Sequence, residues 1–261
     1  MSIKALFFDI DGTLVSFKTH VIPQSTIDAL VQAKQRGIKV YISTGRPVQL
    51  IINLQQITSL IDGYITANGA HCFVGDTTIC CHDIPRPEVD RILATAKECD
   101  KPVVVVGDKH IAVYNDKPIL SEVFRVGLGL NDYPFSTLED IRDERILQVT
   151  PFITQEQEQP LMPLLPSCTS ARWYPAFSDI TNKQADKGKG LHALAAHEGI
   201  DISETMAFGD GGNDVPIIKE AGIGVAMGNA VDEVKQTADF VTRHIDEDGV
   251  AYALRHFGVV S

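Results

Sequence analysis

Two aspartates close the first apolar segment of the chain, and their spacing suits nucleophilic and acid–base chemistry. Residues 3–8 are almost all apolar, Asp9 follows them directly, and Asp11 comes two positions later, ahead of a Gly-Thr turn. Side chains two positions apart on an extended strand point to the same side, so both carboxylates can enter one site at the strand end. Two carboxylates this close repel each other unless a cation lies beside them or one takes up a proton. A hard divalent cation such as Mg²⁺ suits the pair, and one carboxylate could then attack a phosphoryl group while the other transfers protons.

A second acidic turn, at residues 209–214, could complete that site. It reads Gly-Asp-Gly-Gly-Asn-Asp and follows the short, mostly apolar run 205–208. Asp210 offers a third carboxylate for the cation, and the glycines give the loop the backbone freedom to approach the first pair. Asn213 and Asp214 would also suit a role as helix N-caps, and that interpretation stays open beside a role in the site.

A third strand-like segment, 40–44, ends in Ser-Thr and is followed by Gly45 and Arg46. A hydroxyl group and exposed backbone N–H groups after a strand suit an anion such as phosphate. We therefore expect Thr44, together with the backbone of Gly45 and Arg46, to hold phosphoryl oxygens. The Arg46 side chain is open to two interpretations, a phosphate contact or a surface ion pair.

Composition and charge exclude several classes of protein. The 261 residues carry a formal net charge of −11, which argues against a broad nucleic-acid surface because phosphate backbones require clustered Lys and Arg. No apolar run approaches the length of a membrane span and no signal peptide is recognisable, so we expect a cytoplasmic protein without a membrane partner. The five cysteines show no C-x-x-C spacing, and the adjacent pair Cys80-Cys81 suits neither an ordinary disulfide nor a zinc site. We therefore expect reduced thiols.

Strands and helices alternate near both ends of the chain, which indicates an α/β fold with a parallel sheet covered on both faces. The expected strands are 3–9, 38–43, 63–66, 205–209, 223–226 and 239–241, and the expected helices are 24–36, 47–58, 187–198, 214–221 and 230–237. In such sheets ligands bind beyond the carboxyl ends of the strands, where Asp9, Thr44 and Asp210 all fall. Pattern and chemistry therefore agree on one site at one edge of a doubly wound, Rossmann-like sheet.

The middle of the chain has another pattern, typical of a separate α+β module. Prolines interrupt short strand-like runs at 102–106, 110–114, 146–150 and 169–174 and helical stretches at 86–98 and 117–127. We expect residues 1–82 and 181–261 to form the core domain in two parts, and 83–180 to form a smaller inserted domain.

The strings D-x-D-G-T, S-T-G-R and G-D-G-G-N-D resemble, in order and spacing, the motifs of the haloacid dehalogenase-like superfamily of aspartate-nucleophile phosphatases. More narrowly, the chain resembles the Cof-type sugar-phosphatase subfamily, which carries a large α/β cap between the third and fourth core strands. The resemblance implies an Mg²⁺-dependent phosphatase that hydrolyses sugar monophosphates through an aspartyl-phosphate, with hexose phosphates as the expected class.

The same resemblance implies a role for each acidic residue. Asp9 would be the nucleophile, and Asp11 would protonate the leaving sugar oxygen and then deprotonate the attacking water. Mg²⁺ would be held by the Asp9 side chain, the Asp11 backbone carbonyl and Asp210. Asp214 would lie near the metal without binding it, and Asn213 would contact the phosphate.

The family also requires a lysine that neutralises the phosphate and orients the nucleophile. Lys183, Lys187 and Lys189 all lie ahead of Leu191. The family's K-G-x-x-L spacing selects Lys187, which is followed by Gly188 and Leu191, and leaves Lys189 as the second candidate.

The inserted domain is expected to select the substrate by closing over the site. Arg172, Trp173 and Tyr174 could face the leaving group, although a single Trp in a strand is more often part of a core. Asn68, which forms an N-G turn with Gly69, is a further candidate for a substrate contact.

Two other functions fit the same motifs. A phosphomannomutase-like phosphotransferase would use the same aspartate pair and retain the phosphoryl group during turnover. A non-catalytic sugar-phosphate sensor would share the fold but would not require Asp9, Asp11 and Asp210 as an intact set. In each case the expected partner is a small phosphorylated sugar and not a nucleic acid, bound by a monomer or a weak homo-oligomer.

Overall fold

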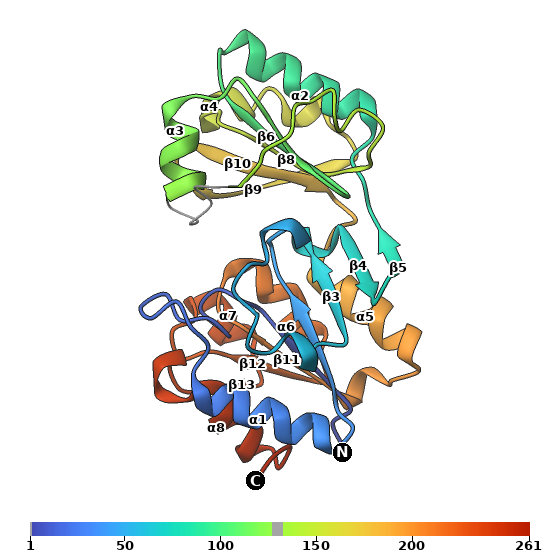
Figure 1. The fold of residues 1–261 in the computed structure, drawn as a ribbon, viewed down its shortest axis with the longest axis vertical. Helices are drawn as coiled ribbons and strands as arrows, with labels where there is room; N and C mark the ends of the chain where they lie inside the picture. Colours follow the sequence, from blue (N-terminus) through green and yellow to red (C-terminus); the bar gives the residue numbers. More distant parts are fainter. Residues whose placement is uncertain (1, 127–132) are drawn as a thin grey trace. The chain divides into compact units, whose positions relative to one another are not determined.

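The chain folds into two compact units, each with its own sheet (Figure 1). The computed structural model describes residues 2–126 and 133–261, and the side chains of 124–126, 173 and 174 are outside this description. The first unit is Met1–Cys81 with Ala185–Ser261, and the second, His82–Gln184, is inserted between these two parts. The sequence predicts the insertion at 83–180; the second unit extends further because strand β10 (Phe177–Asn182) continues past residue 180.

An eight-stranded sheet forms the centre of the first unit. Its strand order is β13-β12-β11-β1-β2-β3-β4-β5, with parallel neighbours from β13 to β3 and antiparallel neighbours from β3 to β5. The strands are β1 (Ala5–Phe8), β2 (Lys39–Ser43), β3 (Gly63–Thr66), β4 (His71–Val74), β5 (Thr77–Cys81), β11 (Thr205–Gly209), β12 (Ile223–Ala226) and β13 (Phe240–Val241). The parallel strands confirm the predicted α/β core, and the β4–β5 hairpin extends it with two antiparallel strands beyond the predicted ranges.

Strand β1 lies inside this sheet and determines where the strand ends meet. Phe8 is in register with Ile42 of β2 and with Phe208 of β11, so the three strands end at the same edge. Phe7 stacks on Tyr41 with 4.8 Å between ring centroids, and Phe8 stacks on Phe208 with 4.7 Å. Burial stabilises each such ring by roughly 1.5–3 kcal/mol, so the register that aligns the strand ends is strongly favoured.

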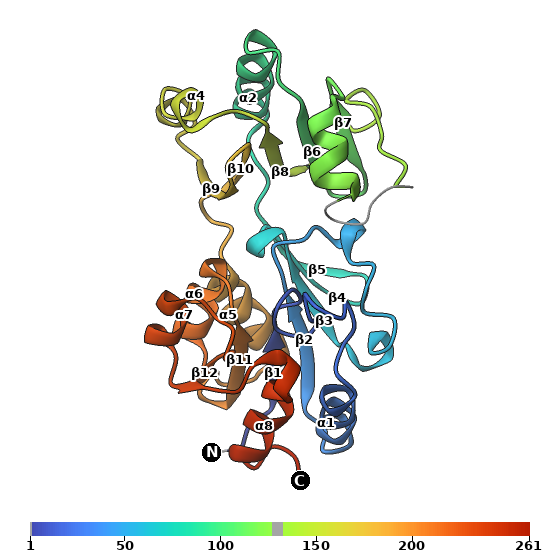
Figure 2. The ribbon, with the colours of Figure 1, turned by 90° about the vertical axis from the view of Figure 1, so that its left-hand side faces the viewer.

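Helices cover both faces of the sheet (Figure 2). One layer holds α1 (Gln24–Gln35) and α8 (Gly249–His256), and the other holds α5 (Lys187–Glu198), α6 (Val215–Glu220) and α7 (Asp232–Thr237). Short 3₁₀ turns join these elements: η3 (Ala67–Gly69), η6 (Ile202–Glu204), η7 (Gly212–Asp214) and η8 (Ile245–Glu247). Within the described ranges, no helix combines the length and the apolar character that crossing a membrane requires.

The segment 47–58 is not the helix that the sequence predicts. It contains the 3₁₀ turn η1 (Val48–Leu50) and reaches a second, η2 (Thr58–Leu60). Its β-branched residues and Asn53 have low helix propensity. In addition, the Arg46 guanidinium donates to the Leu50 carbonyl at 3.0 Å, the acceptor that an α-helix would use for the N–H of residue 54. A side chain from outside the segment therefore takes a backbone acceptor that the helix would need.

The second unit is a five-stranded antiparallel sheet with helices packed on it. Its strand order is β7-β6-β8-β10-β9. The elements are α2 (Arg86–Glu98), β6 (Val103–Gly107), β7 (Ile111–Tyr114), α3 (Pro118–Leu120), the π-helix η4 (Ser121–Val126), β8 (Ile146–Pro151), α4 (Gln155–Glu158), η5 (Met162–Leu164), β9 (Cys168–Tyr174) and β10. Val89 and Ile92 of α2 pack on Val105, Val149 and Ile180 of the sheet in a core separate from that of the first unit. The predicted helix 117–127 is observed to residue 126, and its last residue is outside the described ranges.

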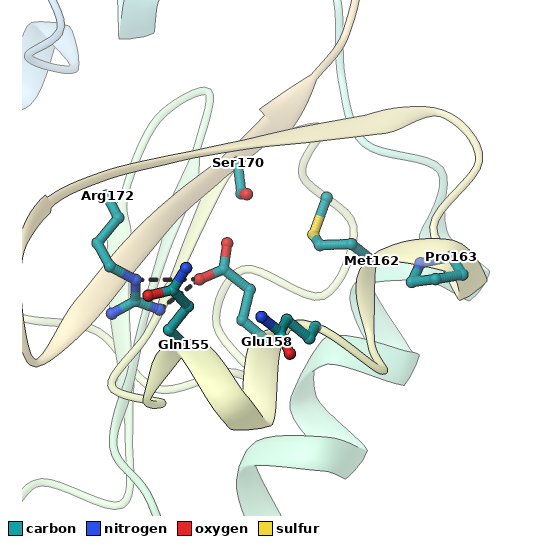
Figure 3. Close-up of a pocket in the computed structure, with 7 residues that line it drawn as sticks. Gln155, Glu158, Met162, Pro163, Ser170 and Arg172 are labelled. Atoms are coloured by element: carbon teal, nitrogen blue, oxygen red, sulfur yellow. Dashed lines mark hydrogen bonds and ion pairs between the residues drawn. The ribbon is translucent and has the colours of Figure 1, made fainter.

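An open pocket of about 650 Å³ lies beside α4 and β9 in the second unit (Figure 3). It is lined by Gln155, Glu158, Gln159, Met162, Pro163, Ser170 and Arg172. Arg172 forms an ion pair with the buried Glu158. Its guanidinium also donates to the backbone carbonyls of Pro175 and Phe177, both at 3.0 Å. Most of the hydrogen-bonding capacity of Arg172 is therefore used inside this unit, and the side chains of Trp173 and Tyr174, its expected companions at the leaving group, are not described.

Replacing Phe8 with alanine should lower the free energy of unfolding by about 3–5 kcal/mol, because the fully buried ring would leave a cavity inside the sheet. Phe17→Ala is the matched control: it removes the same ring from a side chain that is 66% exposed, and we expect a loss of about 0.5 kcal/mol. Urea unfolding followed by circular dichroism measures both values. Equal losses for the two variants would contradict the stabilising role given to the β1 contacts.

Candidate active site

Three buried carboxylates meet at the carboxyl edge of the first unit's sheet. Asp9 follows β1, Asp210 follows β11, and Asp214 ends η7. One oxygen from each carboxylate lies within 4.8 Å of the other two. The backbone N–H of Asp9 donates to the Phe208 carbonyl at 3.1 Å, which holds the two strand ends together. The structure thus brings Asp9 and Asp210 to one place, and Asp214 lies with them.

Lys187, the first residue of α5, lies between two of these carboxylates. Its Nζ is 2.8 Å from Oδ1 of Asp9 and 2.5 Å from Oδ1 of Asp214, and its side chain is only 1% exposed. Burial acts to lower the pKa of Lys187, but the charges of Asp214 and Asp9 outweigh burial and raise it, so the ammonium stays charged. Lys189 is exposed, and its backbone N–H donates to the Asp186 side chain that caps the helix. Of the two lysine candidates, only Lys187 reaches Asp9.

The start of α5 is fixed by a close backbone contact. Gly69 has φ +96°, and a Cβ added to it would lie 2.4 Å from the backbone carbonyl oxygen of Asp186, the residue before Lys187. Only glycine fits this approach of the η3 turn to the helix start. The position of the buried lysine therefore depends on the turn that also carries Asn68.

The carboxylates outnumber the positive charge beside them. Burial raises the pKa of Asp9, and the charges of Asp214 and Asp210 raise it further, against the opposing effect of Lys187. Burial and the charge of Asp214 likewise raise the pKa of Asp210 to about 7. When all three carboxylates are ionised, one ammonium leaves two negative charges without compensation. A divalent cation would supply that charge, and oxygen ligands of this kind suit Mg²⁺.

Asp9 and Asp210 are better placed than Asp214 to hold a cation. Oδ1 of Asp214 accepts from Lys187, and its Oδ2 accepts the backbone N–H groups of Asp210 and Gly211, both at 3.0 Å. Asp214 therefore organises the loop that carries Asp210. Oδ2 of Asp210 comes so close to Gly12 (φ +86°) that a Cβ there would lie 2.2 Å from it, which explains the glycine of the first motif.

The Asp11 side chain is held by Arg46. Nε of Arg46 donates to Oδ2 of Asp11 at 2.7 Å, and Nη2 donates to Oδ1 at 2.8 Å. Bidentate, charge-assisted pairs of this kind are strong and fix the orientation of the carboxylate. From the sequence, two roles remained open for the Arg46 side chain: a contact to phosphate or a surface ion pair. The structure shows an ion pair, and its partner is the second aspartate of the first motif.

The remaining predicted residues gather around Gly45. Thr44 is buried, and its hydroxyl oxygen accepts the backbone N–H of Arg46 at 3.1 Å. Asn213 Nδ2 donates to Asn68 Oδ1 at 2.9 Å, and a Cβ added to Gly45 would lie 3.1–3.2 Å from these two atoms. Asn68 holds a left-handed backbone conformation, φ 55°, which Asn tolerates better than most residues. Thr44, Gly45, Asn68 and Asn213 form a cluster of small polar groups beside the sheet edge at which the carboxylates lie.

Two further residues belong to the site but were not singled out from the sequence. The Thr13 hydroxyl donates to Oδ1 of Asp210 at 2.9 Å. Asn229 donates to the Gly12 carbonyl at 2.8 Å and accepts the backbone N–H of Ile245 at 3.0 Å, which ties the first motif to the loop after β12. Its place just beyond the end of a parallel strand was the available signal, since ligand-binding residues collect at that edge.

The chain is similar over almost its whole length to members of one protein family. A family model described as haloacid dehalogenase-like hydrolase matches residues 6–254. YkrA of Bacillus subtilis (strain 168), provisionally named a phosphatase, is 33% identical over 261 residues, the whole of both chains. The solved structure of BT4131, described as a HAD subclass IIB sugar phosphatase, is 47% identical with a TM-score of 0.89 and covers 98% of this chain and 100% of its own. A second structure, from work on a trigonal-bipyramidal intermediate in a phosphoryl-transfer superfamily, is 46% identical with a TM-score of 0.90 and covers 99% and 100%.

Mg²⁺ should stabilise the protein more at about pH 8 than at about pH 5. Without metal, the pKa of Asp210 is about 7 in the folded state and about its ordinary value of 3.8 in the unfolded chain. Between these two pH values the folded state binds the proton and the unfolded chain does not, so the contribution of Asp210 to the free energy of unfolding falls as pH rises. A bound cation replaces the proton, so its stabilising effect should grow over the same range. Melting temperatures measured with Mg²⁺ and with EDTA at both pH values test this. The variant Asp210→Asn should show a smaller Mg²⁺ effect with a weaker pH dependence than the wild type, in which Asp9 also contributes. An effect in the wild type that is equal at both pH values would contradict the account.

Proposed function

This chain belongs to the haloacid dehalogenase-like hydrolase family, and from this premise we propose that it is an Mg²⁺-dependent phosphatase of sugar monophosphates, with hexose phosphates as the main class. Phosphatase activity follows from the family and from the relatives named as phosphatases. The likeness to a sugar phosphatase supports the substrate class. The observation that carries the proposal is the buried Lys187, whose ammonium binds one oxygen of Asp9 and so orients this carboxylate as a nucleophile.

In the first step, Asp9 attacks the phosphoryl group. Lys187 binds its Oδ1 at 2.8 Å, so Oδ2 forms the bond to phosphorus while the bond from phosphorus to the sugar oxygen breaks. Asp11 gives its proton to the departing oxygen, and an aspartyl-phosphate remains on Asp9. When bound, Mg²⁺ would be held by Asp9, Asp210 and the Asp11 backbone carbonyl and would offset the repulsion between the anionic nucleophile and the anionic phosphoryl group.

In the second step, water hydrolyses the aspartyl-phosphate. Asp11, now ionised, takes a proton from a water molecule, whose oxygen attacks the phosphorus. The bond between phosphorus and Asp9 breaks, inorganic phosphate leaves, and Asp11 is protonated for the next turnover. Asp11 thus serves as the acid in the first step and as the base in the second, because both proton transfers take place at the same position.

The phosphoryl oxygens need hydrogen-bond donors, because negative charge accumulates on them in the transition state. We assign this role to the Thr44 hydroxyl, the backbone N–H of Gly45 and the Asn213 amide, which gather on one side of the strand edge. We assign Asn68 the orientation of Asn213 through their 2.9 Å hydrogen bond. Lys187 adds a fixed positive charge next to the reacting group.

Arg46 is proposed to position Asp11 and not to bind phosphate. Both oxygens of Asp11 accept from its guanidinium, at 2.7 and 2.8 Å, and the same side chain is tied to the Leu50 carbonyl at 3.0 Å. For Asp11 to carry the proton of the first step, one of these two contacts must open, and the remaining hydrogen bond would still limit the rotation of a group that transfers a proton twice at one point.

We assign the choice of leaving group to the second unit, in the role of the family's cap. This unit has its own sheet and apolar core, so it can act as a body during opening and closing. Closure would exclude water from the first step and bring side chains of this unit to the sugar.

The proposal is tested by phosphate release from hexose, pentose and triose phosphates, nucleotides and phosphoserine, with Mg²⁺ and with EDTA. We expect Mg²⁺-dependent release concentrated on the sugar phosphates. Asp9→Asn should abolish release and leave sugar-phosphate binding measurable by calorimetry, because an amide cannot form the aspartyl-phosphate. Asp28→Asn changes an exposed carboxylate on α1 and should retain full activity as the matched control.

Each alternative result has a clear meaning. Tight binding of a sugar phosphate by the wild type without phosphate release would indicate a phosphotransferase that lacks its co-substrate, or a sensor. Normal turnover by Asp9→Asn would exclude Asp9 as the nucleophile. Release confined to nucleotides or phosphoserine would overturn the substrate class while leaving the phosphatase activity intact.

Arg46→Lys should lower kcat by about 10²-fold with KM nearly unchanged, because lysine keeps the charge but cannot hold both oxygens of Asp11. Steady-state kinetics on the best substrate of the panel measures the two constants separately. If Arg46 instead binds the phosphate, KM should rise, and inhibition by inorganic phosphate should weaken in parallel.

A further inference from the structure

Two cysteines face each other across the β4–β5 hairpin. Cys72 and Cys80 are directly opposed in the antiparallel register of these strands. Opposed residues in such a pair have Cα atoms about 4.5–5.5 Å apart and side chains on the same face of the sheet. A disulfide joins Cα atoms about 4.4–6.8 Å apart. The strand register therefore brings these two residues to a Cα separation that a disulfide can span, and the register becomes irregular only between Cys72 and Phe73.

Cys80 is the more reactive of the two thiols. A hydrogen bond from the Cys72 side chain, opposed by burial and aided by the Cys72 backbone, lowers the pKa of Cys80 to about 7. A large share of Cys80 is therefore thiolate near neutral pH, and the thiolate is the nucleophilic form. Cys80 is also only half-buried, whereas Cys72 is fully buried.

Cys72 is suited to react second. It is fully buried, and its Sγ lies 3.9 Å from the Gly69 carbonyl oxygen. A Cβ added to Gly190 of α5 would lie 3.1 Å from this sulfur, so the helix packs closely against it. The hydrogen bond to Cys80 and burial both raise the pKa of Cys72, so it stays a thiol. We therefore expect an oxidant in solution to react with Cys80 first, and Cys72 to react only with the oxidised Cys80 across the hairpin.

The neighbouring cysteine is separated from this pair by the alternation of side chains along a strand. Cys81 is opposed to His71 in the same register, so its side chain points to the other face of the hairpin. The pairing of Cys72 with Cys80, and not with Cys81, is therefore set by the strand register.

We propose that Cys72 and Cys80 form a peroxide-reactive thiol pair that closes to a reversible disulfide. First, the Cys80 sulfur attacks one oxygen of a hydroperoxide and the O–O bond breaks. Cys80 becomes a sulfenic acid, and the departing oxygen takes a proton from solvent and leaves as water or an alcohol. Then the Cys72 sulfur attacks the Cys80 sulfur, the S–O bond breaks, and hydroxide leaves as water with the Cys72 proton. The two thiols lose two electrons in total, and the peroxide gains them.

The test treats the reduced, full-length protein with hydrogen peroxide at neutral pH and then blocks the remaining thiols with a maleimide. We expect two cysteines to escape labelling and to regain it after dithiothreitol. Cleavage before Asp76, in the turn between the strands, separates the two cysteines, so a disulfide-linked pair of peptides identifies the bond. Fragmentation of that pair must place the link at Cys80. A link at Cys81, or peroxide treatment that leaves both thiols free, overturns the proposal.

Single substitutions separate the two steps. Cys80→Ser should leave Cys72 reduced, whereas Cys72→Ser should stop at a sulfenic acid on Cys80 that a dimedone probe traps. Cys99→Ser, which changes a half-buried cysteine of the second unit, should oxidise like the wild type. Oxidation of Cys72 in the Cys80→Ser variant at the wild-type rate would contradict the order of steps. The linked peptides from the wild type decide the case even if Cys72→Ser does not fold.

Discussion

Three carboxylates and one ammonium group share a buried space at the end of β1, with carboxylate oxygens within 4.8 Å of one another. A buried ammonium without a partner would strongly destabilise the folded state. Two adjacent buried carboxylates without a positive charge between them would do the same. Lys187 and its partners Asp9 and Asp214 therefore stabilise one another, and the remaining negative charge favours a divalent cation. The aligned strand ends, the Asp214-bonded loop and the fixed start of α5 all serve to hold these charges at hydrogen-bond distance.

Much of this site could be predicted because its key residues occupy positions that local patterns reveal. Asp9, Thr44 and Asp210 each follow an apolar run of strand length, and parallel strands collect their carboxyl ends at one edge. The preference for Lys187 over Lys189 came from motif spacing alone, and only Lys187 is buried against the carboxylates. Local hydrophobic periodicity also predicted the parallel sheet and the separate inserted unit, because the alternating strands and helices near both ends of the chain differ from the pattern of its middle.

The pairing of Arg46 with Asp11 could not be predicted in the same way. The two residues are 35 positions apart, and their meeting depends on the loop path after β2, which no strand or helix period specifies. The same loop path is one reason why residues 47–58 do not form the predicted helix. The Arg46 guanidinium donates to the Leu50 carbonyl, which would accept a backbone hydrogen bond in an α-helix. The role of Asn229 was not predicted for a related reason. Its partners Gly12 and Ile245 lie in distant segments of the chain, and a single asparagine after a strand is not part of a recognisable motif.

The place of β1 in the sheet has a consequence for how the chain is made. Its two neighbours are β2, which follows within 50 residues of the start, and β11 (Thr205–Gly209), which leaves the ribosome only after the whole second unit. Until then the nascent chain presents one unpaired edge of an entirely apolar strand, the kind of edge that joins other chains. The second unit is continuous in sequence and can fold as it emerges, whereas the first must wait for its C-terminal part. In newly synthesised chains the β11 edge of β1 therefore stays without its native partner until the second unit and β11 itself have been made.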